Sequence, residues 1–174
     1  MARIVSACFA LAIAGTVSSA EAQRATQVLS AASAGTIVDG CRKHAEGLNK
    51  SQAIAVYDTG GNLVAALRMD RNSAAIMQFA SEKAKAAALW GFPTSAMENI
   101  IKAAPGFAQA PNVVGLPGGL PVYTADGKTL LGGAGASGES SADDVACIEA
   151  GIKAAGLASS RPAPPAPPPQ PAPK

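Results

Sequence analysis

The sequence predicts an α+β fold: an antiparallel sheet built from hairpins, with helices packed on it. Two pairs of short apolar runs are each joined by a turn-forming segment, which is typical of β-hairpins. Before, between and after these pairs, apolar residues recur at three- and four-residue steps, the period of helices. Because hairpins connect the strands directly, an antiparallel sheet fits this order better than a parallel one.

The first predicted helix covers residues 25–48. The face of it that we expect to be buried carries Ala34, Ile37, Val38, Cys41, Ala45 and Leu48. Gly35 and Gly40 weaken such a helix by about 1 kcal/mol each relative to alanine. We therefore expect that these glycines allow close contact with another element.

The first hairpin is predicted at residues 53–58 and 63–69. Between the two runs, Thr59–Asn62 contains the glycine and asparagine residues that accept the positive φ of a tight turn. A helix follows, and Asp70, Asn72 and Ser73 offer side-chain oxygens that can accept from its first free amides. Gly91 and Pro93 are a normal stop signal for that helix.

The second half of the chain is predicted to hold a short helix, a second hairpin and a last helix. Ser95 and Glu98 have the spacing of a capping box for the short helix. Residues 120–123 and 129–131 flank an Asp-Gly turn, which marks the second hairpin. Serines at 140–141, followed by two aspartates, predict the start of the last helix.

The two ends of the chain differ in composition from the middle. Residues 1–22 combine a basic start, a short apolar run and an Ala-Glu-Ala cleavage signal, so we interpret them as a signal peptide. A membrane anchor fits less well, because the run is shorter than the roughly 20 residues that span a bilayer. We therefore expect a periplasmic or secreted protein without a membrane span after cleavage. Residues 158–174 are proline-rich, which predicts a disordered tail, with a spacer or a ligand for a proline-binding groove as alternatives.

Residues 23–157 have the size of one compact domain. The net charge is +2, and removal of residues 1–22 leaves it unchanged, since that segment carries one basic and one acidic residue. A near-neutral chain without a basic run argues against nucleic acid as a partner.

Cys41 and Cys147 are the two cysteines that remain after residues 1–22 are removed. An even number of cysteines in an oxidising compartment favours a disulfide. It would join the first helix to the last one and close a loop of about 100 residues, worth about 4–5 kcal/mol in the chain-entropy model. The alternative is a pair of buried thiols too far apart to bond.

Several motifs stand in an order that is found in one known family. They are Asp58–Leu63, Arg68–Asp70, Lys83–Ala87, Gly91–Thr94, Gly118–Val122 and Leu131–Gly138. Together they resemble the GlcG/HbpS haem-binding, "haem-degrading" family, over roughly residues 29–157. The resemblance implies a profilin-like fold, haem or a related tetrapyrrole as the bound cofactor, and a homo-oligomer.

A haem site needs an apolar wall, close backbone and one or two cations for the propionates. We expect Arg68 and Lys83 to supply the cations from consecutive elements that face one cleft. Gly118 and Gly119 lack side chains and would bring backbone close to the ligand. Lys83 could instead be a solvated helix residue.

Two residues are candidates for the iron ligand. His44 is the only histidine and could coordinate iron through nitrogen, although such a residue near a helix end is more often a surface or helix-capping residue. Met69 could offer an axial thioether or simply pack within its strand.

Two catalytic interpretations are disfavoured by the sequence itself. Residues 133–138 match G-x-G-x-x-G, but no strand with an acidic residue follows, so a dinucleotide site is rejected. Ser137 lacks the glycine of a nucleophile elbow, since Glu139 stands in that place. We therefore expect a haem-binding protein rather than an enzyme. The alternatives are a haem-degrading or small-molecule-converting enzyme and a structural or sensory oligomeric module without a cofactor.

Overall fold

A computed structural model describes residues 26–163 of the chain. The predicted signal peptide and most of the proline-rich tail lie outside these residues. The elements, in chain order, are α1 (Ala31–Gly47), β1 (Ala53–Asp58), β2 (Leu63–Arg68), α2 (Ala74–Trp90), α3 (Thr94–Ala103), the 3-10 helix η1 (Pro105–Gln109), β3 (Gly119–Tyr123), β4 (Leu130–Ser137) and α4 (Ser141–Ala154).

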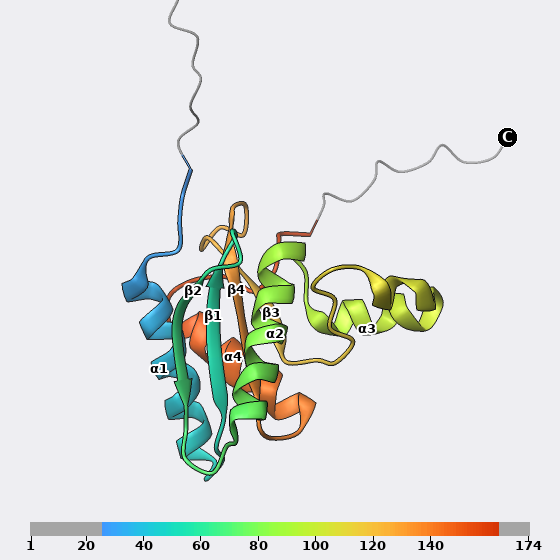
Figure 1. Ribbon diagram of the computed structural model, residues 1–174. Helices are drawn as coiled ribbons and strands as arrows, with labels where there is room; N and C mark the ends of the chain where they lie inside the picture. Colours follow the sequence, from blue (N-terminus) through green and yellow to red (C-terminus); the bar gives the residue numbers. More distant parts are fainter. Residues whose placement is uncertain (1–25, 164–174) are drawn as a thin grey trace, which may run out of the picture.

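The four strands form one antiparallel sheet in the order β2-β1-β4-β3. α2 covers one face of this sheet, while α1 and α4 lie together on the other face (Figure 1). The core between the sheet and the α1–α4 layer is made of aliphatic residues and alanines from all these elements. This architecture confirms the predicted α+β fold with hairpins and packed helices.

Serine side chains set the starts of three helices. Ser30 accepts a hydrogen bond from the backbone of Ser33, so α1 begins at Ala31 and not at residue 25 as predicted. Ser73 caps α2 in the same way, and Ser140 caps α4. Gly91 ends α2 in the left-handed conformation, with φ of 71°, as its position in the sequence predicts.

The start of α3 differs from the prediction. Its N-cap is Pro93, no side chain caps it, and Glu98 forms an ion pair with Lys102 instead of reaching back to the helix start. The capping-box prediction was therefore wrong. α3 and η1 project from the side of the domain (Figure 1). Trp90 anchors this projection through an edge-to-face contact with Phe107.

The glycine-rich strand β4 is built for close packing. A Cβ atom at Gly133 would lie 2.5 Å from the carbonyl oxygen of Ala84, and one at Gly135 would lie 2.5 Å from the amide nitrogen of the same residue. Neither position therefore has room for a side chain. These glycines let α2 lie directly on the sheet, in a regular strand that pairs with β1 and β3.

A disulfide between Cys41 and Cys147 joins α1 to α4, as the sequence predicts. The two helices also approach closely at Gly151, where a Cβ atom would lie 2.3 Å from the carbonyl oxygen of Ile37. Both cysteines are buried. Covalent and close-packed contacts therefore hold these two helices together as one layer.

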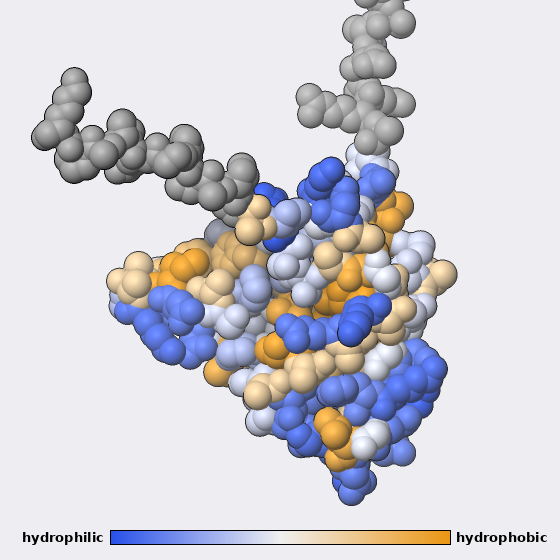
Figure 2. All heavy atoms as spheres, turned by 180° about the vertical axis from the view of Figure 1, so that it is seen from behind, coloured by the Kyte–Doolittle hydropathy of each residue, from blue (hydrophilic) through white to orange (hydrophobic). Residues whose placement is uncertain are grey.

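Figure 2 shows the molecule from behind the view of Figure 1, where hydrophilic residues cover much of the surface and apolar residues gather in smaller patches. This agrees with α1 and α4 turning their apolar sides toward the sheet. In residues 26–163, no helix combines the length and hydropathy that a membrane crossing requires.

Candidate functional site

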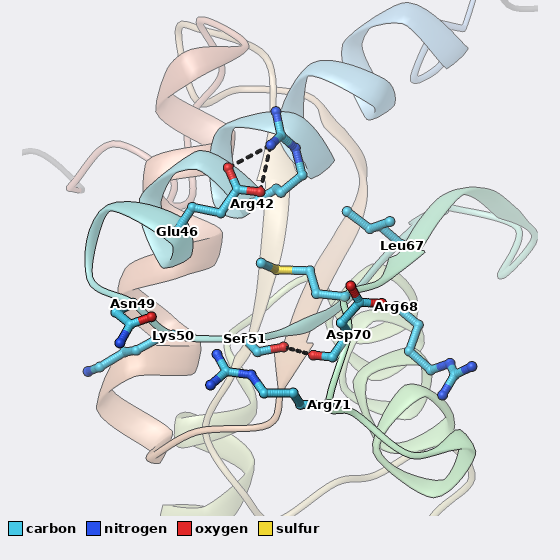
Figure 3. Close-up of a pocket in the computed structure, with 10 residues that line it drawn as sticks. Arg42, Glu46, Asn49, Lys50, Ser51, Leu67, Arg68, Asp70 and Arg71 are labelled. Atoms are coloured by element: carbon cyan, nitrogen blue, oxygen red, sulfur yellow. Dashed lines mark hydrogen bonds and ion pairs between the residues drawn. The ribbon is translucent and has the colours of Figure 1, made fainter.

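A pocket of about 410 Å³ lies where the end of α1 meets the end of β2 (Figure 3). The segment that leads into β1 and the turn that follows β2 complete its wall. The lining residues are Arg42, Glu46, Asn49, Lys50, Ser51, Leu67, Arg68, Met69, Asp70 and Arg71.

The register of β2 decides which of its side chains face the pocket. Leu67 pairs with Ile54 of the core, so it lies on the face covered by α1. Arg68, the next residue, points to the opposite face because side chains alternate along a strand. Figure 3 shows its guanidinium directed away from Arg42 and Glu46. Arg68 therefore contributes to the rim of the pocket, where it donates to the carbonyl of Asn72.

The cations of the pocket differ in how far their charge is already neutralised. Arg42 forms ion pairs with Asp39 and Glu46. Lys50 pairs with Asp143 at the start of α4. Arg71 is exposed, and within residues 26–163 no hydrogen bond or ion pair engages its side chain. Arg71 is thus the cation of this pocket that is most available to an anionic ligand.

The backbone at Arg71 adopts a conformation that is unusual for a residue with a side chain. Its φ of 74° puts it in the left-handed region, which a side chain other than glycine adopts at a cost of about 1–2 kcal/mol. The turn between β2 and α2 imposes this conformation. Figure 3 shows the Arg71 side chain extending below Ser51 and toward Lys50.

Met69 forms part of the apolar wall. Its sulfur accepts a hydrogen bond from the backbone amide of Gln52, at 3.3 Å, and its side chain packs against the core. These contacts agree with the packing alternative that the sequence left open. Iron ligation by Met69 stays a prediction.

Lys83 lies elsewhere, inside the domain. It is 2% exposed, and its Nζ donates to Asp144 Oδ2 at 2.8 Å and to the carbonyl of Ala136 at 3.2 Å. Its ammonium also lies 4.8 Å from the centre of the Phe79 ring. The expectation that Arg68 and Lys83 face one cleft is therefore corrected: Lys83 holds α2 to the start of α4, and it does not line the pocket.

Gly118 and Gly119 lie beside Lys83. A Cβ atom at Gly118, whose φ is 122°, would lie 2.7 Å from Lys83 Nζ. One at Gly119 would lie 2.3 Å from the carbonyl oxygen of Lys83. The structure thus brings these three predicted site residues together, but the space left by the glycines is occupied by Lys83 and its helix.

The electrostatics of this interior pair follow from its burial. Burial raises the pKa of the Asp144 carboxyl above its ordinary value, although the hydrogen bond from Lys83 acts in the opposite direction. Gln52 lies close enough to lower the pKa of Asp144 as well. The Oε1 atom of Gln52 is buried, and among the described residues it has no hydrogen-bond partner.

His44 is half-buried in the last turn of α1 and is not among the residues that line the pocket. Its place at the negative end of the helix dipole fits the capping alternative. Across residues 26–163, no group of three or more histidine, cysteine, aspartate or glutamate side chains could hold a metal ion.

Sequence reasoning missed Arg42, Lys50 and Arg71 as pocket residues. Arg42 and Lys50 lie in ordinary helix-end and loop positions, and no periodicity distinguishes them from solvated residues. For Arg71 the signal was available in part, because it follows the Arg68–Asp70 segment and precedes the Ser73 cap. Its left-handed conformation could not be read from the sequence.

Residues 29–153 match the model of a protein family described as haem-degrading protein, HbpS-like. The Escherichia coli protein GlcG is 35% identical to this chain over 111 residues, which cover 63% of this chain and 81% of GlcG.

Solved structures share the fold. The crystal structure of HbpS superimposes with a TM-score of 0.71 at 24% identity, covering 79% of this chain and 97% of HbpS. A double mutant of Streptomyces reticuli HbpS gives 0.72 at 26% identity, with 82% and 97% covered. A complex of PduOC with haem gives 0.70 at 19% identity, with 78% and 100% covered.

Proposed function

This chain belongs to the family of HbpS-like, haem-degrading proteins, and on that premise we propose that it binds haem or a related tetrapyrrole in the pocket between α1 and β2. The family description and the haem-bound PduOC structure of the same fold support this ligand class. The observation that carries the location is the Arg71 side chain, which pairs with no described residue and lies beside the apolar side chains of Leu67 and Met69.

The chemistry of the pocket suits this ligand. A haem presents an apolar macrocycle and two propionates, and the pocket offers an apolar wall together with an excess of cations. Four cationic side chains line it, and two of these, Arg68 and Arg71, form no ion pair with a described residue, whereas Arg42 and Lys50 do. Its volume of about 410 Å³ falls within the range of roughly 300–1,000 Å³ that is usual for small-molecule sites.

The residues have distinct roles in this proposal. Arg71 pairs with one propionate, and Arg68 and Lys50 line the rim around the other. Leu67 and Met69 contact the macrocycle. The predicted coordination of iron by His44 would need the macrocycle to reach a different side of α1, so the pocket assigns no iron ligand.

Haemin titration followed by the Soret band tests the site. Arg71→Ala should weaken haemin binding by about 10- to 100-fold, because a hydrogen bond to a charged group contributes roughly 1.5–3 kcal/mol. Lys43→Ala is the matched control: it removes one positive charge from α1, at a residue that does not line the pocket. Equal losses in both variants would mean that net charge, and not the pocket, attracts haemin.

The same experiment addresses the enzymatic alternative suggested by the family description. With a reductant present and peroxide scavenged, a stable Soret band indicates a binding protein. Steady loss of the band, absent in Arg71→Ala, would indicate haem degradation at this pocket.

We also infer export and self-association. Export rests on residues 1–22, and it predicts that the protein recovered from the periplasm begins at Gln23. Intact-mass measurement checks this, and retention of residues 1–22 in that fraction would contradict it. Self-association rests on the family resemblance and is measured by light scattering.

A further inference from the structure

The two edges of the sheet are treated differently by the fold. At the β3 edge, Tyr123 pairs with Ala158 through two backbone hydrogen bonds, and Pro121 has no amide hydrogen to offer. At the β2 edge, no strand of the described residues pairs with the outer side of β2. Ala66 and Arg68 are exposed there. β2 is therefore the open edge of the sheet (Figure 1).

The hydrogen-bond pattern shows which groups point outward from β2. The amide of Met69 donates to the carbonyl of Gln52, so these two residues form a hydrogen-bonded pair. Such pairs alternate along an antiparallel ladder, which makes Leu67 and Ala65 the next residues that bond to β1. The backbone amides and carbonyls of Ala66 and Arg68 consequently face away from the sheet.

We propose that this edge pairs antiparallel with β2 of a second copy of the chain, with the two-fold axis at Ala66. In that register the two Ala66 residues exchange both hydrogen bonds, and Arg68 lies opposite Val64 of the other copy. The result is a continuous eight-stranded sheet. This gives the self-association proposed above a defined surface, and it depends on no assignment of the haem pocket.

Charge and side-chain size favour a second copy of the chain as the partner and antiparallel pairing of the two β2 strands. The end of β2 carries Arg68 and Arg71, whereas Asp58 and the turn after it lie at the other end. Antiparallel pairing brings unlike ends together, and parallel pairing would bring like charges together. The two Ala66 side chains would lie on the same face of the paired strands, and their small size avoids a steric conflict between them.

Cross-linking tests the register. In a Cys8→Ser background, Ala66→Cys should form a disulfide-linked dimer under mild oxidation. Cα atoms of a hydrogen-bonded antiparallel pair are about 5.5 Å apart, within the range for a disulfide. Arg68→Cys is the matched control on the same strand, because its two copies would be about 13 Å apart. Equal linking of both variants, or none with Ala66→Cys, overturns the register.

A proline substitution tests the surface. Ala66→Pro removes an outward amide that the isolated domain does not use, so the fold should survive, as a thermal melt would show. The dissociation constant of the dimer should rise by more than about tenfold, while Ala66→Ser should leave it unchanged. A wild-type chain that is monomeric, or an oligomer that Ala66→Pro does not weaken, overturns the proposal. Haemin binding measured on the same samples is a separate readout, so failure of the haem site is recognised independently.

Discussion

Lys83 and Arg71 are two cations near the same end of the sheet. Lys83 is buried inside the domain, and Arg71 lies at the open pocket. The ammonium of Lys83 is 2% exposed and is bound by Asp144 and a backbone carbonyl. Arg71 is exposed, and its side chain makes no ion pair with any described residue. The comparison indicates that the role of a cationic side chain depends on whether its charge is already neutralised, more than on whether it is lysine or arginine. A cation whose charge is already paired holds the fold, and an unpaired one is available to a ligand.

The largest expected effect comes from cutting the covalent link of the interior. Cys41→Ser with Cys147→Ser should lower the free energy of unfolding by about 4–5 kcal/mol, because the disulfide spans 106 residues. Denaturant unfolding measures this. Haemin affinity of the remaining folded protein should be unchanged, and a large loss of affinity would show that the pocket depends on the α1–α4 layer.

Lys83→Ala should have the next largest effect on stability. It leaves the Asp144 carboxylate buried without its cationic partner, which costs about 3–5 kcal/mol. The double variant Lys83→Met with Asp144→Leu should recover most of that loss, since no charge remains buried. Urea denaturation of the three proteins measures both steps. If Lys83→Ala kept its stability and lost haemin binding instead, Lys83 and not Arg71 would be the cation that binds the ligand.

Arg71→Gly should separate stability from binding at the pocket. Glycine adopts a φ of 74° without steric cost, so the free energy of unfolding should rise by up to about 1 kcal/mol. Haemin binding should fall as in Arg71→Ala. Thermal denaturation and Soret titration measure the two effects. A stabilised variant with full affinity would remove Arg71 from the site.

The smallest expected effect concerns the acid sensitivity that the Asp58 carboxylate gives to the fold. Backbone and side-chain hydrogen bonds from Asn62 lower the pKa of Asp58 below its ordinary value of 3.8, the reverse of the direction at Asp144. Asp58 therefore contributes stability that is present above pH 3.8 and is lost as the pH falls through its pKa in the folded protein. In Asp58→Asn, the melting temperature should fall less between neutral pH and about pH 3. If the melting temperature fell equally in the wild type and in Asp58→Asn over this pH range, the contribution of Asp58 would be excluded.

Local patterns predicted most of the fold. The first hairpin, α2 with its Gly91 stop and the Cys41–Cys147 disulfide all follow from neighbouring residues or from the number of cysteines. The failures were also local. Ser95 and Glu98 have the spacing of a capping box, yet Glu98 forms an ion pair with Lys102, one helical turn further on.

The site was predicted less well because it depends on contacts between distant residues. Lys83 was predicted to face one cleft with Arg68, but its partner Asp144 is 61 residues away in the sequence, and no pattern connects the two. Arg68 and Met69 were placed at the end of β2, where the pocket lies. The other wall comes from α1, and only the tertiary fold brings the two together.

The order of the strands has a consequence for how the chain reaches its native state. β1 and β2 are joined by a tight turn, and so are β3 and β4, so each hairpin forms from residues close in sequence within microseconds. The central ladder is different, because it joins Asp58 to Gly132 and Ala53 to Ser137. Pairing of residues so far apart must close a long loop first, which is the slow step in folding of such topologies. We therefore expect the docking of the two hairpins to limit the folding rate, and an early Cys41–Cys147 bond to accelerate it.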